Sequence, residues 1–226
     1  MRRLKLIFVH IPKSGGTSVR ATVTEFFSRD LVLADYDDRP NDPISPMNID
    51  PYGFLDRCRQ QNALALANKA AVIGHFWIAK YEGVAADVRA TILREPISRA
   101  TSQFFFWPAQ NANNALHQYV ISNHLTFIEF ARIPRVNSLY TSIYFRDVDM
   151  AQFDFIGTYD RLSQDWTPTL ARMGIPALPR RELNRTIDLV AEYDTRRSEI
   201  LDDHRMMARL RDLFADDLRF YERFAR

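Results

Sequence analysis

A lysine, two adjacent glycines and two hydroxyl side chains follow the first apolar run of the chain, in the stretch HIPKSGGTSV at residues 10–19. Glycine lets a backbone turn pass close to a ligand, and the free N–H groups and the dipole at a helix start favour an anion. The lysine can reach over such a pocket, and a hydroxyl can cap the helix or bind the anion. The stretch therefore predicts a phosphate or sulfate site. Its expected members are Pro12, Lys13, Ser14, Gly15, Gly16, Thr17 and Ser18.

The lysine of this stretch is unusual for the chain, which has 4 lysines among its 30 basic residues. Its position also separates the stretch from the nucleoside-triphosphate loop G-x-x-x-x-G-K-[ST], in which the lysine follows the glycines and the hydroxyl binds magnesium. Here Lys13 precedes the glycines, and the first glycine of that motif is absent. Taken alone, the stretch is also compatible with a capped strand-to-helix turn that carries a lysine by chance.

A second stretch, TILREPISRATSQF at residues 91–104, has the residues needed to grip another phosphate. Arg94 stands at the end of a predicted strand, Pro96 at a helix start, and Ser102 about two helical turns further on. An arginine and a hydroxyl in this relation can bind one phosphate together. The alternative is an arginine ion pair beside an ordinary helical serine. Arg99 either adds a phosphate contact or forms a surface ion pair.

Together the two stretches resemble the sulfotransferases that use 3′-phosphoadenosine 5′-phosphosulfate (PAPS). PKSGGTS is similar to their loop for the 5′-phosphosulfate, and REPISRATS to their 3′-phosphate element, R-x-P-x-x-R-x-x-S. The HIPKSGGTS form most resembles the branch with the uronyl and heparan 2-O-sulfotransferases and their bacterial relatives. Weaker similarity at GHF, FIGTYDRL, LNRT and DDLRFYERF extends over most of the chain.

The resemblance implies a parallel sheet of P-loop-like topology and transfer of a sulfuryl group to a hydroxyl or amine. PAPS would be the donor and 3′,5′-adenosine bisphosphate (PAP) the product, with no metal required. It implies that Lys13 contacts the bridging oxygen of the leaving 5′-phosphate. It also implies that Arg94 and Ser102 bind the 3′-phosphate. The segment LNRT resembles a late element that covers the cofactor in relatives. Its residues Asn184, Arg185 and Thr186 are therefore expected at the cofactor.

An acceptor hydroxyl needs a base, and His75 in AVIGHFW is the candidate, just beyond a buried strand. Ligands of open α/β sheets lie outside the carboxyl ends of the strands, and histidine has a suitable pKa. Its GH context resembles the catalytic base of the 2-O-sulfotransferase branch, and the alternative is a histidine that closes the strand. His10 is expected to be a core histidine that orients the loop. His117, His124 and His204 lie in helical context, and nothing distinguishes them.

The acceptor site is the part on which the sequence says least. Trp77 and Tyr81, just after His75, are expected to pack against a sugar or aromatic acceptor. The aspartate-rich segment 35–51 would repel a sulfated polymer if it borders the cleft. We therefore expect a neutral glycan, a glycolipid or a small hydroxylated metabolite as acceptor.

The elements expected around these residues alternate between strands and helices, which is typical of an α/β sheet with crossover helices. Strands are predicted at 4–11, 71–76, 90–93 and 153–159. Helices are predicted at 18–27, 54–67 and 98–107, two or three short ones within 116–145, and one long amphipathic helix at 200–224. Residues 35–51, with four prolines and five aspartates, are predicted to form a long loop.

The composition fits one globular domain over residues 1–226, with 46% hydrophobic and 26% charged residues. A net charge of +2 gives no general case for nucleic acid or an anionic membrane. Cys58 is the one cysteine, no apolar run reaches the roughly 20 residues of a bilayer span, and no signal peptide is evident. A soluble, cytoplasmic protein is expected. Two alternatives stay open: a nucleotide kinase or other nucleoside-triphosphate enzyme, and a non-catalytic nucleotide-binding protein.

Overall fold

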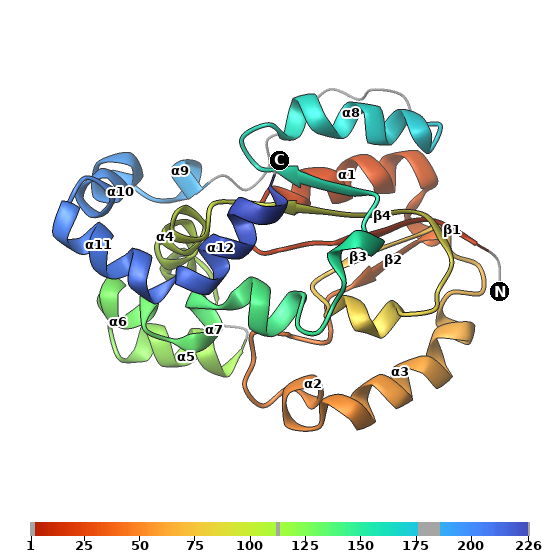
Figure 1. The fold of residues 1–226 in the computed structure, drawn as a ribbon, viewed down its shortest axis with the longest axis horizontal. Helices are drawn as coiled ribbons and strands as arrows, with labels where there is room; N and C mark the ends of the chain where they lie inside the picture. Colours follow the sequence, from red (N-terminus) through yellow and green to blue (C-terminus); the bar gives the residue numbers. More distant parts are fainter. Residues whose placement is uncertain (1–2, 112–113, 176–185, 226) are drawn as a thin grey trace.

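The centre of the fold is a five-stranded sheet (Figure 1). The computed structural model describes residues 3–111, 114–175 and 186–225, without the side chains at 163 and 165. Every paired strand runs parallel to its neighbour, in the order β2-β3-β1-β4-β5. The strands are β1 (Leu4–Val9), β2 (Val32–Asp35), β3 (Ala71–Gly74), β4 (Ala86–Leu93) and β5 (Phe155–Thr158).

Strand β1 lies in the middle of the sheet, where the direction of chain winding changes. Leu6 pairs with Ala71 of β3 on one side and with Val88 of β4 on the other. The chain first adds β2 and β3 to one side of β1 and then crosses to add β4 and β5 to the other. The carboxyl end of β1 is therefore at the topological switch point, where open α/β sheets bind their ligands.

Alternate side chains of β1 enter two separate cores, as the period of two in a strand requires. Leu6 and Phe8 pack with α1 (Gly16–Phe27) and α8 (Leu162–Arg172). On the other face, Ile7 and Val9 belong to a core with the π-helical turn at Tyr140–Tyr144 and the end of α3; α12 packs against it. The bounds of those helices are Pro51–Ala65 for α3 and Ala215–Phe224 for α12.

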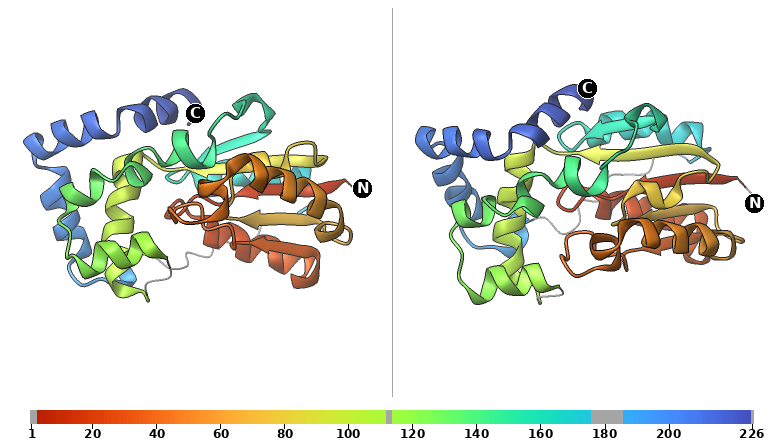
Figure 2. Two further views of the ribbon diagram at one scale, coloured as in Figure 1. Left: turned by 90° about the horizontal axis from the view of Figure 1, so that it is seen from below. Right: turned by 60° about the horizontal axis from the view of Figure 1, so that its bottom comes forward.

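Seven further helices that the structure describes pack beside the sheet as a separate helical group (Figures 1 and 2). Their shared core includes Ile97, Phe130, Leu210 and Phe214, all of them almost fully buried. This group carries α4 over the carboxyl ends of the strands. Its members are α4 (Pro96–Phe106), α5 (Ala115–Ser122), α6 (Phe127–Ala131), α7 (Pro134–Asn137), α9 (Thr186–Leu189), α10 (Tyr193–Leu201) and α11 (His204–Leu213).

The expected fold class, a parallel α/β sheet of P-loop-like topology flanked by helices, is confirmed. The four predicted strands are present, and the short strand β2 was missed because VLAD carries no clear pattern. The predicted helix at 200–224 is wrong as one element. It is divided into the end of α10, then α11 and α12, since Asp203 caps α11 by accepting from the N–H groups of Arg205 and Met206. The predicted loop 35–51 contains the short helix α2 (Pro46–Ile49).

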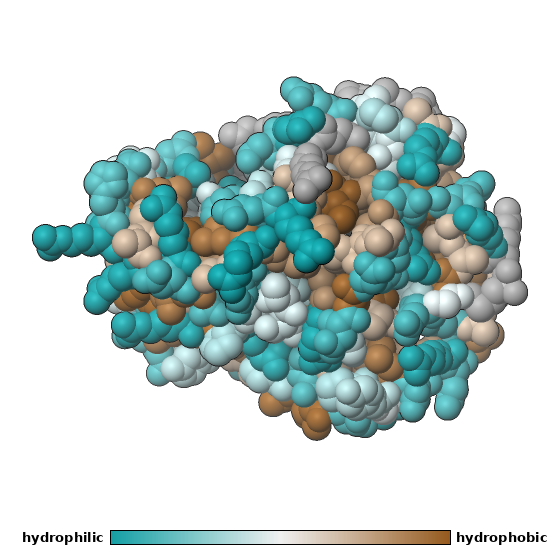
Figure 3. Space-filling view, viewed as in Figure 1, coloured by the Kyte–Doolittle hydropathy of each residue, from teal (hydrophilic) through white to brown (hydrophobic). Residues whose placement is uncertain are grey.

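Hydrophilic side chains cover most of the face in Figure 3, and apolar side chains show in separate patches. Among the described residues, Ile44, Ile49, Tyr52 and Leu64 are the most exposed large apolar residues. No helix in the described part of the chain combines the length and apolar character that a membrane crossing requires.

Candidate active site

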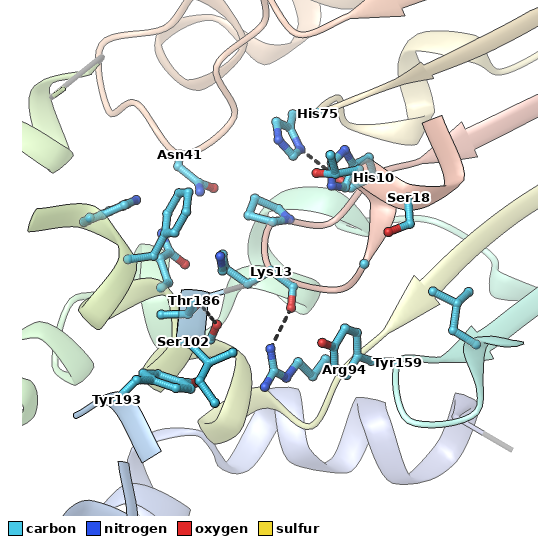
Figure 4. Close-up of a pocket in the computed structure, with 18 of the residues that line it drawn as sticks. His10, Lys13, Ser18, Asn41, His75, Arg94, Ser102, Tyr159, Thr186 and Tyr193 are labelled. Carbon is cyan, nitrogen blue, oxygen red and sulfur yellow. Dashed lines mark hydrogen bonds between the residues drawn. The ribbon is translucent and has the colours of Figure 1, made fainter. Parts of the chain in front are cut away.

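A pocket of about 590 Å³ opens at the carboxyl ends of the strands (Figure 4). Residues that follow all five strands lie in or beside it, since His10, Tyr36, His75, Arg94 and Tyr159 each come directly after a strand. Described residues that line it are His10, Pro12, Lys13, Gly15, Thr17, Ser18, Asn41, His75, Arg94, Ser102, Gln103, Phe106, Trp107, Asn114, Tyr159, Leu162, Thr186, Ile187, Tyr193 and Asp194.

The two glycines at the turn from β1 to α1 have separate steric reasons. Gly15 has φ 82°, a left-handed conformation that favours glycine. Gly16 is the first residue of α1, and a Cβ there would lie 2.0 Å from the His10 ring. The glycine pair therefore lets the helix begin directly against the end of β1, with its N-terminus at the pocket.

The start of α1 differs from the start of α4 in its capping. None of the described side chains caps α1, whereas the Glu95 carboxylate accepts from the backbone N–H groups of Ile97 and Ser98 at 3.1 and 2.6 Å. The first turn of α4 is therefore already satisfied by a carboxylate. The first turn of α1 keeps its dipole for an anion, and Thr17 and Ser18 line the pocket there.

Lys13 extends into the pocket from the loop, with its Nζ 3.5 Å from the centroid of the Phe106 ring. Burial, and then the neighbouring Arg94 charge, lower the pKa of Lys13 to about 7. An anion in the pocket would favour the charged amine and raise that pKa again. Lys13 is therefore placed to respond to a bound phosphate or sulfate group.

Arg94 connects the two motifs that the sequence separates by eighty residues. Its Nη1 donates to the carbonyl oxygen of Lys13 at 3.1 Å, and its guanidinium lies 4.4 Å from the centroid of the Tyr159 ring. The Tyr140 hydroxyl donates to the Arg94 carbonyl at 2.6 Å and receives the Arg94 N–H at 3.1 Å, which holds the backbone at the strand end. Arg94 is thereby held beside the loop that carries Lys13.

Ser102 and Thr186 join the same pocket from α4 and α9. Their hydroxyl oxygens lie 2.9 Å apart, and both residues are buried. Because a hydroxyl has one hydrogen and two lone pairs, this pair can donate a further hydrogen bond to an anion. Thr186, which was named from the LNRT segment, therefore lines the same pocket as Ser102.

His75 is held by a hydrogen bond from its Nδ1 to the backbone carbonyl of His10 at 2.5 Å. A carbonyl can only accept, so Nδ1 carries the proton and Nε2 of the neutral ring carries the lone pair. Burial, the largest cause, lowers the pKa of His75 to about 4, and the Arg20 charge lowers it further, against the raising effect of the His10 carbonyl. The ring is therefore a neutral proton acceptor at neutral pH.

The pocket has two sides with Lys13 between them (Figure 4). His75 and Asn41 lie on one side, next to the end of β1. Arg94 and Ser102 lie on the other side, with Thr186 and Tyr193 from the helical group. The arrangement offers an anion-binding half, a central cation and a half with a neutral base.

Several expected residues lie elsewhere. Ser14 is buried beneath the loop, and Gly16 packs on His10; neither belongs to the described pocket lining. Arg99 is fully buried in the helical group, where it donates to the Gln103 side chain and the Val136 carbonyl, so both expected roles for it are wrong. Asn184 and Arg185 lie outside the described residues.

Trp77 and Tyr81 also require correction, because neither is among the pocket residues that the structure describes. Trp77 is 4% exposed and donates from Nε1 to the Arg146 carbonyl, and Tyr81 is 1% exposed and donates to Asp35. The chain turns away from the pocket after His75, and the 3₁₀ turn at Ile78–Tyr81 enters the core. Trp77 and Tyr81 are close to His75 in the sequence, but their side chains do not share its pocket.

The pocket also contains residues that sequence reasoning missed. Tyr159 follows β5, so it could have been predicted from the rule that ligands lie at the carboxyl ends of the strands. Asn41 lies in the long segment 35–51, which had been noted without naming a residue. Phe106 lies against the Lys13 amine, and neither motif includes it. Tyr193 carries no local signal at all, because α10 reaches the pocket only through the packing of the helical group.

The strand order and the anion cradle after β1 define a P-loop-like α/β fold of the sulfotransferase kind. The structural alignment with mouse sulfotransferase SULT7A1, solved in complex with PAP, covers 97% of this chain and 86% of the SULT7A1 chain. The TM-score is 0.52 and the sequence identity is 14%. A sulfotransferase from Alicyclobacillus acidocaldarius matches 95% of this chain and 97% of its own, with a TM-score of 0.39 and 14% identity. The first likeness shows a shared fold. No family model and no curated protein matches the sequence.

Proposed function

We propose that this protein is a PAPS-dependent sulfotransferase. One observation carries the proposal: the cradle at residues 12–18 and the Arg94–Ser102 element, far apart in sequence, line one pocket. A donor with a 5′-phosphosulfate and a 3′-phosphate needs two anion sites at one nucleotide, and this pocket offers two. The sulfotransferase fold and the sequence resemblance support the same donor.

The proposed reaction is an in-line displacement at sulfur, analogous to phosphoryl transfer. The acceptor oxygen forms a bond to sulfur while the bond from sulfur to the bridging oxygen of the 5′-phosphate breaks. The acceptor proton passes to Nε2 of His75, and PAP leaves. The charged form of Lys13 stabilises the negative charge on the departing phosphate oxygen, and the dipole of α1 adds to it. We propose that the reaction needs no metal ion.

The acceptor that we propose is a hydroxyl of a carbohydrate, a glycolipid or a small metabolite. One reason given for a neutral acceptor is weakened by the structure. Asp35 and Asp38 both pair with Lys80, so the segment 35–51 exerts less negative charge on the pocket than its composition suggests. The buried, free Cys58 is compatible with a reducing compartment, and we extend the proposal to the cytoplasm.

The donor can be tested against the competing nucleoside-triphosphate enzyme by thermal shift. PAP should raise the melting temperature without magnesium, and ATP with or without magnesium should raise it much less. Stabilisation that favours magnesium-ATP would refute the proposal. A mass-spectrometric screen of hydroxyl acceptors with PAPS then separates an enzyme from a non-catalytic binding protein, because a turned-over acceptor gains the mass of one SO₃ unit.

A further inference from the structure

Tyr36, which comes directly after β2, lies against His10, which follows β1, and His75, which follows β3. Its ring stands edge-on to the His75 ring, with centroids 4.7 Å apart and planes at 88°. It stands in the same way to the His10 ring, at 5.8 Å and 89°. The two histidine rings lie 4.4 Å apart. Tyr36 is outside the described pocket lining.

His10 contacts both partners through different atoms. Its carbonyl oxygen accepts the Nδ1–H of His75, and its own Nδ1 lies 2.9 Å from the Tyr36 hydroxyl. The other edge of its ring lies against Gly16, where a Cβ would leave no room. The His10 ring is thus held between Tyr36 and the start of α1.

The segment that carries Tyr36 is anchored by buried charges on both sides of it. The Lys80 Nζ lies 2.8 Å from Asp35 and 2.7 Å from Asp38, and the Tyr81 hydroxyl donates to Asp35 at 2.7 Å. These three charged side chains are only 8–13% exposed. Asp35 is held one residue before Tyr36 and Asp38 two residues after it, which limits the movement of the backbone that carries the Tyr36 ring.

The charged groups facing the histidines are Arg20 from α1 and Lys13 from the loop. Burial is the largest cause that lowers the pKa of both histidines, and the Arg20 charge acts in the same direction on both. The Arg20 guanidinium lies 5.3 Å from the centroid of the Tyr36 ring. Burial raises the pKa of Tyr36, so its hydroxyl keeps its hydrogen. Two neutral rings and one neutral hydroxyl therefore form the cluster at neutral pH.

We propose that Tyr36 is a positioning residue for the base, holding His75 in the Nδ1–H tautomer with Nε2 free for the acceptor proton. It does so by two contacts. Its ring confines the His75 ring, and its hydroxyl holds His10, whose carbonyl oxygen accepts the hydrogen bond from Nδ1–H of His75. The proposal rests on the function proposed above, in which His75 is the base. Its structural half, the tautomer, can be measured without turnover.

The test compares Tyr36→Phe, which keeps the ring, with Tyr36→Leu, which removes it; Tyr52→Phe, on a side chain that is 82% exposed, is the matched control. Nitrogen-15 spectra of the 5 histidines give tautomer and pKa, with His75 assigned by its loss in His75→Ala. We expect Tyr36→Leu to turn His75 into a tautomer mixture and to lower kcat about tenfold to a hundredfold. We expect Tyr36→Phe to lower kcat about two- to tenfold, as for one lost hydrogen bond.

PAP affinity and the KM for PAPS should stay within about twofold of the unmodified protein in both variants, since Tyr36 does not face the donor. The proposal is overturned if Tyr36→Leu leaves the tautomer of His75 unchanged, or if it weakens PAP binding as much as it lowers kcat. A protein that transfers no sulfate to any acceptor would refute the proposed function, and the tautomer in Tyr36→Leu would still decide whether Tyr36 positions His75.

Discussion

The Arg94 guanidinium donates a hydrogen bond to the carbonyl oxygen of Lys13 at 3.1 Å. This contact joins the loop after β1 to the end of β4, which are neighbouring strands at the centre of the sheet. Both side chains also line the pocket, with Lys13 at its centre and Arg94 on the side of Ser102. The two positive residues therefore act on one ligand from different positions, and their variants should differ.

Lys13→Ala should mainly lower kcat, because the charge of the lysine is needed as the leaving phosphate forms. Arg94→Ala should mainly weaken donor and PAP binding, because a 3′-phosphate is held equally before and during the reaction. Steady-state kinetics with calorimetry on PAP measure both effects. Lys5→Ala, at the opposite end of β1, is the control for lost charge. The reverse pattern would contradict these roles.

Binding of PAP should take up a proton at Lys13. The pKa of Lys13 in the empty pocket is lowered to about 7, and a bound phosphate raises it. Above about pH 7 the free protein therefore holds less proton at Lys13 than the complex, and affinity should fall as pH rises. Calorimetry near pH 8 in buffers of different ionisation enthalpy measures the uptake, at a pH where phosphate (second pKa about 6) no longer titrates. Equal uptake in Lys13→Met would assign the proton elsewhere.

Ser102→Ala should weaken the binding of PAPS and PAP by a similar factor. A hydrogen bond to a charged group is worth about 1.5–3 kcal/mol, which is roughly 10- to 150-fold in affinity. Part of the loss would come through Thr186, whose hydroxyl loses its partner. Ser122→Ala, at the exposed end of α5, is the control. Unchanged calorimetric affinity for both ligands would make Ser102 structural.

His75→Ala should lower turnover by roughly 10²–10⁴-fold and leave PAP affinity nearly unchanged. Only the neutral ring accepts a proton, so kcat/KM for PAPS should rise with pH through about 4, the lowered pKa of His75 in the empty pocket, and fall above about pH 7 as Lys13 loses its proton. Bound anions raise the pKa of His75, so the rise in kcat should lie at higher pH. His124→Ala, on an exposed histidine, is the control. Near-normal turnover in folded His75→Ala would place the base elsewhere.

Lys80→Met should destabilise the fold by roughly 3–5 kcal/mol at pH 8, because it leaves the buried Asp35 and Asp38 without a cation. Burial and Asp35 already raise the pKa of Asp38 to about 6, and loss of Lys80 raises it further. Asp38 can therefore protonate in the variant at pH 5, and the loss should be smaller there. Urea unfolding at the two pH values measures the difference. An equal loss of stability in Lys5→Met, which removes the cation of an exposed ion pair, would contradict the assignment.

Four of the five strands and the anion cradle could be predicted from local patterns. Leu6 and Phe8 alternate with Ile7 and Val9 in the first strand, and a run of this kind reads as a buried strand wherever it occurs. The glycine pair after it implies a tight turn in any fold. Most cofactor residues named from the two motifs do line one pocket, because motif residues act close to their own strand ends.

Other features depended on distant parts of the chain. The helix expected at 200–224 breaks where Asp203 caps α11, and periodicity alone cannot show a break between two amphipathic helices of similar phase. Trp77 and Tyr81 have the residue types of an acceptor site, yet the turn after His75 directs them into the core. Burial of this kind is decided by what packs on a segment.

The sequence by itself determined the strand-to-helix cradle and the arginine–serine element, since each is a contiguous segment whose chemistry follows from residue order. The tertiary structure alone decided that the two share a pocket, that Arg94 bonds the Lys13 backbone, and that Tyr36 lies against His10 and His75. These contacts join β1 to β2 and β4, and sheet pairing brings them together. A sequence records neither that pairing nor the burial that lowers the pKa of Lys13 and His75.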